Sequence, residues 1–311
     1  MRVLLTGASS FTGTWFARAL AAAGHEVVAP LRGSPAGYEG VRAERVRQLA
    51  GVARLIPECP FGSASFQALI AAEDFDLLCH HAAEVGDYRS PDFDVAAALA
   101  ANTRALRPLL ATMGGRGLKG VVLTGSVFAQ DEGAGGEGAG EAPLRAFSPY
   151  GLSKGLTREV FRYWCGAAGI PLGHFVIANP FGPLEEPRFC TYLFRTWRAG
   201  KTAEVRTPRY VRDNVPVRAL AEAYAGFAAR LAGGVGEIRL GPSFYVETQG
   251  AFAERLAREV RARSTLACAL AFAEQTDFSE PMSRINLDPI RLSAAAEAAL
   301  WDEYIETALE S

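Results

Sequence analysis

Arg2-Val3-Leu4-Leu5-Thr6-Gly7-Ala8-Ser9-Ser10-Phe11-Thr12-Gly13 is the stretch that decides the fold of this 311-residue chain. It begins as a short buried strand, and apolar side chains at helical spacing follow it as far as Leu20. Gly24 then ends the helix, and residues 26–31 form a second apolar strand. In a unit of strand, glycine turn, helix and strand, the backbone and the helix N-terminus can hold a pyrophosphate. The stretch therefore predicts dinucleotide binding. An ordinary tight turn is the alternative, because the glycine spacing is incomplete.

Strands and helices go on alternating to about residue 178, with a sixth strand expected over residues 172–178. This alternation predicts an α/β fold with a mostly parallel, doubly wound sheet and helices on both faces. Beyond it we expect helices over residues 189–197, 217–231, 249–262 and 293–309, and short strands near 204–205 and 238–240. We therefore assign residues 1–178 to a nucleotide-binding domain and residues 179–311 to a smaller α+β substrate lobe.

The second motif is Tyr150-Gly151-Leu152-Ser153-Lys154, in which the tyrosine and the lysine share one helix face. A nearby ammonium favours the phenolate and so lowers the pKa of a tyrosine from its usual value of about 10. The pair suits proton exchange with a hydroxyl or a carbonyl. Taken alone, it could also be an exposed helical pair.

Together the two motifs resemble the extended branch of the short-chain dehydrogenase/reductase superfamily, which mostly modifies nucleotide sugars. Four further segments are similar to motifs of this family. Leu78–Ala83 is similar to its fourth strand with the His-x-Ala-Ala end, and Asn102-Thr103 is similar to its helix asparagine. Asn179–Pro183 is similar to its Asn-x-Tyr-Gly-Pro motif, and Val211–Val217 is similar to its Arg-Asp-Phe/Tyr-x-x-Val segment. The motifs run in the expected order from residue 3 to residue 217. The resemblance implies a Rossmann fold, NAD(P) as cofactor, a nucleotide-sugar substrate, and a later strand that returns to the sheet of the cofactor domain.

The resemblance also implies roles for single residues. Tyr150 would give a proton to the substrate, Lys154 would hold the nicotinamide ribose, and Thr124 would orient the carbonyl oxygen, with Ser126 as reserve and as a substrate contact. Asn179 and Arg212 would meet the substrate diphosphate, although a plain turn and a local salt bridge with Asp213 are the alternatives. The expected cofactor contacts are Gly7, Ser9, Ser10, Phe11, Thr12, Gly13, Arg32, Ala82, Ala83, Tyr150, Lys154 and Pro180.

Two departures from the family pattern bear on this assignment. Ser10 replaces the middle glycine of the turn, where its Cβ would resist a positive φ while its hydroxyl could donate to a phosphate. Gly125-Ser126 stands where the family's 4,6-dehydratases carry an Asp-Glu pair. Because dehydration would lack its acid and base, a ketoreductase or an epimerase remains.

The end of the second strand bears on the choice of nicotinamide cofactor. An Asp or Glu there usually takes the ribose hydroxyls of NAD, whereas a 2′-phosphate requires a cation. This chain has Arg32-Gly33-Ser34 and no acid, which favours NADP(H) over NAD(H). A solvated arginine beside a permissive NAD site is the alternative.

The sequence thus predicts an NADP(H)-dependent oxidoreductase that reduces a 4-keto (6-deoxy)hexose linked to a nucleotide. A nucleotide-sugar 4-epimerase with tightly held NAD is the first alternative, and a catalytically idle NADP(H)-binding sensor is the second. Glu84, Asp87 and Tyr88 are candidates for the wall of the sugar pocket. The glycine-rich segment 131–141 is either a lid over the sugar or a surface loop.

Composition agrees with an enzyme of this kind. A formal charge of −2 leaves no basic footprint for nucleic acid, and 49% hydrophobic residues suffice for a large core. Without a leader or an apolar run near 18 residues, we expect a cytoplasmic protein that binds no membrane. Five scattered cysteines predict buried free thiols or neutral fillers, and the four histidines predict no metal site. The resemblance implies a homodimer built on helices at about 92–113 and 149–167, whose apolar side chains are otherwise core.

Overall fold

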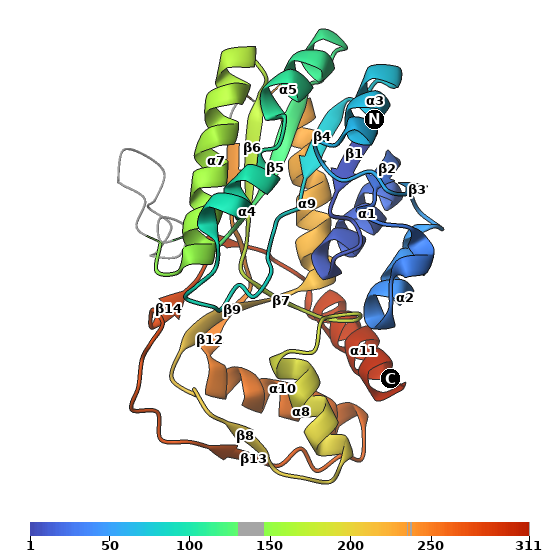
Figure 1. Ribbon diagram of the computed structural model, residues 1–311. Helices are drawn as coiled ribbons and strands as arrows, with labels where there is room; N and C mark the ends of the chain where they lie inside the picture. The colour runs from blue at the N-terminus through green and yellow to red at the C-terminus, as the bar shows by residue number, and fades with distance from the viewer. Residues whose placement is uncertain (130–145, 235, 237, 311) are drawn as a thin grey trace.

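The computed structural model describes residues 1–129, 146–234, 236 and 238–310. The segment 131–141, expected to be a lid or a surface loop, lies outside the described residues. Figure 1 shows two tiers, with the N-terminal strands and helices above and the C-terminal helices and small sheets below.

The upper tier is built on a seven-stranded sheet in which every strand is parallel to its neighbours. The strand order is β10-β6-β5-β4-β1-β2-β3. The strands are β1 Arg2–Thr6, β2 Glu26–Pro30, β3 Arg54–Ile56, β4 Leu77–His80, β5 Gly120–Ser126, β6 Leu172–Ile177 and β10 Ile238–Leu240. The first strand lies in the middle, where Leu4 pairs with Val28 on one side and with Leu78 on the other. The predicted α/β class with a doubly wound parallel sheet is confirmed.

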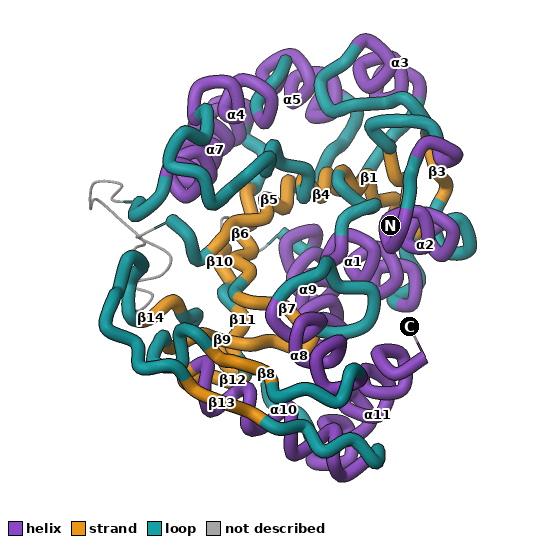
Figure 2. The backbone as a smooth tube through the Cα atoms, turned by 60° about the horizontal axis from the view of Figure 1, so that its bottom comes forward, coloured by secondary structure: helices purple, strands orange, loops and turns teal. Residues whose placement is uncertain are grey.

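Helices cover both faces of this sheet (Figure 2). One face carries α1 Phe11–Ala22, α2 Gly40–Leu49 and α9 Val217–Ala232. The other carries α3 Ala64–Ala72, α4 Val95–Asn102, α5 Leu106–Gly115 and α7 Pro149–Ala168, and a short 3₁₀ helix, η1 Pro35–Gly37, precedes α2. Each face has its own core: Phe16 stacks on Tyr224 at 3.9 Å on the first, and Phe161 is fully buried on the second.

Local sequence fixes the ends of α7, the helix that carries Tyr150 and Lys154. Ser148 accepts a hydrogen bond from the Gly151 amide, and Pro149 begins the helix, so both start signals are present. Gly169 ends it in the left-handed conformation, with φ of 66°. The twenty residues between them form one uninterrupted helix.

The chain returns to the sheet after it has entered the C-terminal region. β10 pairs in parallel with β6 and so extends the sheet, although it lies beyond residue 179. We expected residues 217–231 to belong to the substrate lobe, but that placement is wrong. The apolar face of α9, including Leu220, Tyr224 and Phe227, is buried in the same core as Phe16 of α1.

The lower tier contains a four-stranded sheet and two strand pairs. The larger sheet has the order β12-β9-β14, and β7 also pairs with β9. Its strands are β7 Asn179–Phe181, β9 Val211–Pro216, β12 Tyr245–Thr248 and β14 Ser283–Arg284; the pairs are β8 Ala203–Val205 with β13 Leu270–Phe272, and β11 Pro242–Ser243 with β15 Asp288–Pro289. Helices α8 Phe189–Arg198, α10 Gln249–Arg263 and α11 Ala294–Glu310 enclose a third core around Phe181, Phe252 and Trp301.

Several sequence predictions concern what the fold buries. All five cysteines are buried and free, as predicted. Leu106, Leu109, Leu110 and Phe161 lie in the core, so these side chains of the expected dimer helices are structural. None of the helices in the described part of the chain has the length and apolar character needed to cross a bilayer. Within the same residues, no three His, Cys, Asp or Glu side chains come together as metal ligands.

Candidate active site

The sequence-predicted cofactor turn joins β1 to α1 and packs against the end of β4. Gly7 has φ of +74°, and a Cβ there would lie 2.7 Å from the Ala82 nitrogen. A Cβ on Gly13 would lie 2.2 Å from the carbonyl oxygen of Gly7. Both contacts are with backbone atoms that cannot step aside, so both positions require glycine.

Ser10 occupies this turn without strain. Its φ is −78°, so the positive φ that we expected its Cβ to resist does not occur. Its hydroxyl donates to the Gly7 carbonyl at 2.8 Å and accepts from the Gly13 amide at 3.2 Å, which makes Ser10 the N-cap of α1. The hydroxyl is therefore used inside the turn.

His81, directly after β4, contacts the side chains of the same turn. Its Nε2 lies 3.0 Å from Ser10 Oγ and 2.9 Å from Thr12 Oγ1, and its ring meets Phe16 edge-on. Because the Ser10 proton goes to the Gly7 carbonyl, Ser10 accepts from His81, whose proton is then on Nε2. Burial, and next the charge of Lys154, lower the pKa of His81 to about 3. A neutral imidazole thus braces the turn, and no sequence pattern pointed to it.

The first amides of α1 are available to a ligand. Neither Phe11 nor Thr12 donates its backbone N–H to another described residue, as expected for the first positions of a helix. Ser9 is 4% exposed and lies at the start of the turn. The carboxyl ends of β1, β2, β4, β5 and β6 meet at this edge of the sheet, where ligands bind in open parallel sheets.

Three charged side chains lie near the end of β2, and the sequence predicted only Arg32 at this position. The Arg32 side chain is 67% exposed, and its Nη1 lies 3.6 Å from a carboxylate oxygen of Glu84, which we expected in the sugar pocket. The edge therefore does contain an acid, contributed by the segment after β4. A second cation, Arg42 of α2, reaches the Ser9 hydroxyl from Nη2 at 3.0 Å.

Tyr150 and Lys154 lie in the first turns of α7, beside the end of β5. Lys154 is 7% exposed, and its Nζ donates to the Thr124 carbonyl oxygen at 2.7 Å. The Tyr150 ring is surrounded by aromatic rings, those of Phe128 at 5.6 Å, Tyr88 at 5.7 Å and Phe93 at 5.8 Å. The structure therefore brings Lys154 and Thr124 together through the threonine backbone, with Tyr150 one helical turn before the lysine.

The two hydroxyl candidates on β5 differ in their surroundings. Thr124 is 2% exposed, and its hydroxyl faces that of Tyr224 on α9 without reaching hydrogen-bond geometry. Ser126 Oγ accepts from the Phe128 amide at 3.3 Å. The Thr124 hydroxyl is therefore a buried polar group with unused bonding capacity.

Asn102 of α4 joins the strand ends to α7. Its Oδ1 accepts from the Glu84 amide at 2.7 Å, and its Nδ2 lies 3.4 Å from Thr157 Oγ1. Thr157 is one turn beyond Lys154 on α7. This buried side chain holds the segment after β4 in register with the helix that carries the tyrosine and the lysine.

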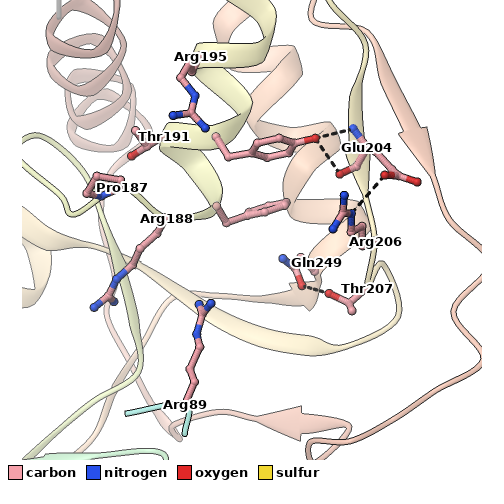
Figure 3. Close-up of a pocket in the computed structure, with 11 residues that line it drawn as sticks. Arg89, Pro187, Arg188, Thr191, Arg195, Glu204, Arg206, Thr207 and Gln249 are labelled. Atoms are coloured by element: carbon pink, nitrogen blue, oxygen red, sulfur yellow. Dashed lines mark hydrogen bonds and ion pairs between the residues drawn. The ribbon is translucent and has the colours of Figure 1, made fainter. Parts of the chain in front are cut away.

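An arginine-rich cavity of about 490 Å³ lies in the lower tier, between α8, β8 and α10 (Figure 3). It is lined by Arg89, Pro187, Arg188, Phe189, Thr191, Tyr192, Arg195, Glu204, Arg206, Thr207 and Gln249. Arg89 and Arg188 both lie over the Tyr88 ring, at 5.4 and 5.9 Å. Tyr88 also contacts the Tyr150 ring, so it lies between two of the cavity arginines and the tyrosine of α7.

Arg212 and Arg284 form a second basic group near Phe128. Each places a guanidinium nitrogen 2.9 Å from the same oxygen of Glu280. Arg284 lies 4.3 Å above the Phe128 ring, and its Nε and Nη1 are buried without a hydrogen-bond partner among the described residues. Burial, and next the charge of Arg212, lower the pKa of Arg284 to about 10. Sequence reasoning missed Arg284, which no motif marks.

The remaining predicted substrate residues make protein contacts. The alternative of a local salt bridge between Arg212 and Asp213 is wrong, because Arg212 pairs with Glu280 while Asp213 accepts the amides of Phe244 and Asn286. Asn179 donates from Nδ2 to Asn214 at 2.5 Å and remains exposed at its strand end.

An α/β protein with a glycine turn at the carboxyl edge of its parallel sheet, and a buried lysine near a tyrosine beside that edge, is a nucleotide-binding protein of the Rossmann type. The chain belongs to the NAD dependent epimerase/dehydratase family, whose sequence model matches residues 3–239. The resemblance to extended short-chain dehydrogenases is therefore confirmed.

Solved structures agree in fold over nearly the whole chain. A dTDP-glucose 4,6-dehydratase from Streptomyces venezuelae, with NAD and TYD bound, is 23% identical, with a TM-score of 0.70 over 98% of this chain and 97% of that one. A UDP-N-acetylglucosamine 4-epimerase from Methanobrevibacter ruminantium M1 is 15% identical, with a TM-score of 0.73 over 99% and 98% of the two chains. A UDP-glucuronic acid 4-epimerase from Bacillus cereus, with UDP-glucuronic acid and NAD, is 14% identical, with a TM-score of 0.72 over 100% and 99%.

Proposed function

We propose that this protein is an NADP(H)-dependent oxidoreductase that reduces a keto group, at carbon 4 of a (6-deoxy)hexose, on a nucleotide-linked sugar. The observation that carries the proposal is the buried Lys154 bound to the Thr124 carbonyl, one turn from Tyr150 at the carboxyl end of β5. A buried ammonium needs a reason for its desolvation, and a neighbouring phenol that must lose a proton supplies one.

The turn fits a dinucleotide. A Cβ at Gly7 or Gly13 would fill the cradle, and the amides of Phe11 and Thr12 are free to meet a pyrophosphate. Ser9 and Ser10 complete the turn, and Ala82, Ala83 and Pro180 lie after β4 and on β7. In this proposal Tyr150 and Lys154, at the start of α7, hold the nicotinamide ribose. A bound nicotinamide would supply hydride transfer.

The protein's own part in the reaction is proton supply and orientation. Tyr150 gives its phenolic proton to the substrate oxygen, and Lys154 stabilises the phenolate that this leaves. Thr124, the expected partner, points its hydroxyl at Tyr224 of α9, on the face of the sheet opposite α7, so in this proposal the reserve Ser126 orients the carbonyl through a hydrogen bond. The aromatic rings around Tyr150 exclude water from the proton transfer.

The basic groups suit a nucleoside diphosphate. Arg284 has two buried donors without partners, next to Arg212 and beside the Phe128 ring that contacts Tyr150. Arg284 shares the single carboxylate of Glu280 with Arg212, and burying its two remaining donors without acceptors is costly, so phosphate oxygens would satisfy them. In this arrangement Arg212, Arg284 and Asn179 hold the diphosphate, the sugar reaches Tyr150 past Tyr88, and the cavity beside α8 takes the remainder of the nucleotide.

Two observations bear on the alternatives. The structurally similar epimerase from Bacillus cereus and the dehydratase from Streptomyces venezuelae were solved with NAD, which favours a 4-epimerase with bound NAD as the second candidate. Gly125-Ser126 lacks the acidic pair expected for dehydration. The idle sensor gains no support from a buried Lys154. A cytoplasmic location remains a prediction, as does a homodimer through the helices at about 92–113 and 149–167.

The test is turnover of a nucleotide-linked 4-keto-6-deoxyhexose, followed by loss of NADPH absorbance. We expect Tyr150→Phe to lower kcat by about 10²- to 10⁴-fold while the Kd of NADPH stays within about twofold. Tyr163→Phe, on the exposed side of the same helix, is the matched control and should retain full activity. NAD that survives purification, with no net NADPH consumption, would establish the epimerase instead. A biological function that persists in Tyr150→Phe would favour the third candidate, a catalytically idle NADP(H)-binding sensor.

A further inference from the structure

Arg42 lies at the edge where the cofactor turn meets β2, and no counter-charge faces it among the residues that the structure describes. Its Nη2 and Nε lie 3.0 and 3.3 Å from the Ser9 hydroxyl oxygen. Two N–H groups of a guanidinium edge therefore converge on one neutral oxygen. A guanidinium edge matches two oxygens of a phosphate better than one hydroxyl, so the Ser9 contact leaves binding capacity unused.

The neighbouring arginines differ from Arg42 because each has a carboxylate. Arg45 pairs with Glu186 at 2.6 Å, Arg47 pairs with Glu44, and Arg32 lies 3.6 Å from Glu84. For Arg42, no carboxylate within the described ranges comes within ion-pair distance. Its positive charge is thus the least compensated at this edge.

Tyr38 holds Arg42 in relation to the end of β2. The guanidinium lies 5.2 Å from the centre of the Tyr38 ring, and the Tyr38 hydroxyl accepts the Gly33 amide at 3.3 Å. Gly33 directly follows Arg32, at the position where a Rossmann unit contacts the adenosine ribose. The cation is therefore oriented before any ligand arrives, with Ser9 of the turn on one side and the β2 end on the other.

We propose that Arg42, with Ser9, is the main determinant for the 2′-phosphate of NADP(H), and that Arg32 contributes less because Glu84 partly neutralises it. On binding, the guanidinium edge of Arg42 moves from the single Ser9 oxygen to two phosphate oxygens, and the Ser9 hydroxyl donates to the same phosphate. The inference rests on the proposed NADP(H) preference and names the residue that carries it.

The experiment compares Arg42→Met, Arg32→Met and the control Arg47→Met in the full-length protein. Arg47 is on the same helix, is 76% exposed, and pairs with Glu44 of its own helix. The probes are NADPH, NADH and adenosine 2′,5′-bisphosphate, titrated calorimetrically, with melting curves to check folding. Adenosine 2′,5′-bisphosphate carries the 2′-phosphate without the nicotinamide, so its affinity does not depend on catalysis.

We expect Arg42→Met to weaken NADPH and adenosine 2′,5′-bisphosphate tenfold or more, and NADH by less than twofold. Arg32→Met should weaken the phosphorylated probes by a smaller factor, and Arg47→Met should match the wild type. A wild-type preference for NADPH that persists in Arg42→Met would overturn this inference alone, as would an equal loss for NADPH and NADH. Wild-type protein that binds NADH as tightly as NADPH would overturn the proposed NADP(H) preference together with it.

Discussion

Replacing Glu185 by glutamine should make the protein more stable at pH 8 and leave its stability nearly unchanged at pH 5. The Glu185 carboxylate accepts the Tyr304 hydroxyl at 2.6 Å and the Thr191 hydroxyl at 3.1 Å, so it joins α11 to α8. Burial raises the pKa of Glu185 from 4.5 to about 7, and the hydrogen bonds only partly oppose this rise. A glutamine amide can accept the Tyr304 proton without carrying a charge.

The sign and size follow from the two pKa values. Between pH 4.5 and 7 the folded protein keeps a proton that the unfolded chain has released, so stability falls as the pH rises through this window and stays lower above it. One pKa unit is about 1.4 kcal/mol, and a rise from 4.5 to about 7 therefore destabilises the charged form by roughly 3 kcal/mol. Glu185→Gln removes this penalty, which corresponds to a melting temperature higher by roughly 5 °C at pH 8.

Thermal melting of the wild type and Glu185→Gln at pH 5, 6, 7 and 8 measures this difference. Glu186→Gln is the matched control, because its carboxylate pairs with Arg45, which is fully buried. That variant should lose about 2 kcal/mol or more at pH 8, since it leaves a buried guanidinium without its ion pair. Equal destabilisation of Glu185→Gln at pH 5 and pH 8 would show that the carboxylate is ionised throughout, and would refute the reasoning.

Three further predictions concern the site. Gly13→Ala should weaken dinucleotide binding more than tenfold in calorimetry and lower the melting temperature, because its Cβ would lie 2.2 Å from the Gly7 carbonyl oxygen. An unchanged affinity would show that the turn can accommodate a Cβ without a loss of binding free energy. Ser10→Ala and His81→Leu should be non-additive by about 1 kcal/mol in a double-mutant cycle of dinucleotide affinity, because the two side chains are hydrogen-bonded; additive losses would contradict the brace. Arg284→Met should raise the KM of the nucleotide sugar about tenfold or more with a smaller change in kcat, and an unaltered KM would remove Arg284 from the substrate site.

Most helices and strands could be predicted from the sequence because each one is specified by residues within its own segment. The β1–α1 turn, the end of α7 at Gly169 and the helices α8, α10 and α11 follow from glycine positions, caps and apolar periodicity within one segment. α9 was correctly predicted as a helix but placed in the wrong part of the fold. Its periodicity gives an apolar face, yet nothing in the segment says that Phe16 of α1 covers that face.

Less of the candidate site could be predicted, because most of its contacts join residues from different segments. Tyr150 and Lys154 are four residues apart, and their proximity follows from helix geometry alone. Glu84 beside Arg32, and Arg284 beside Arg212, are pairs brought together by different strands, and neither pair has a sequence spacing that could reveal it. The sequence shows which of these residues are charged, but it does not predict which charged side chains lie next to one another at the site.

The segment between β7 and α8 links the sheet to the arginine-rich cavity. Trp15 of α1 donates to the Pro183 carbonyl at 3.1 Å, and Arg45 of α2 donates to the Leu184 carbonyl at 2.7 Å. The next residue, Glu185, is bound to α11, and Arg188 then enters the cavity. Because the same few residues contact the cofactor half and position a cavity arginine, a change at Arg45 should alter the KM of the substrate without touching it. We therefore expect Arg45→Met, measured with saturating NADPH, to raise the KM of the nucleotide sugar, and an unchanged KM in a folded variant would limit the buried Arg45 to a role in stability.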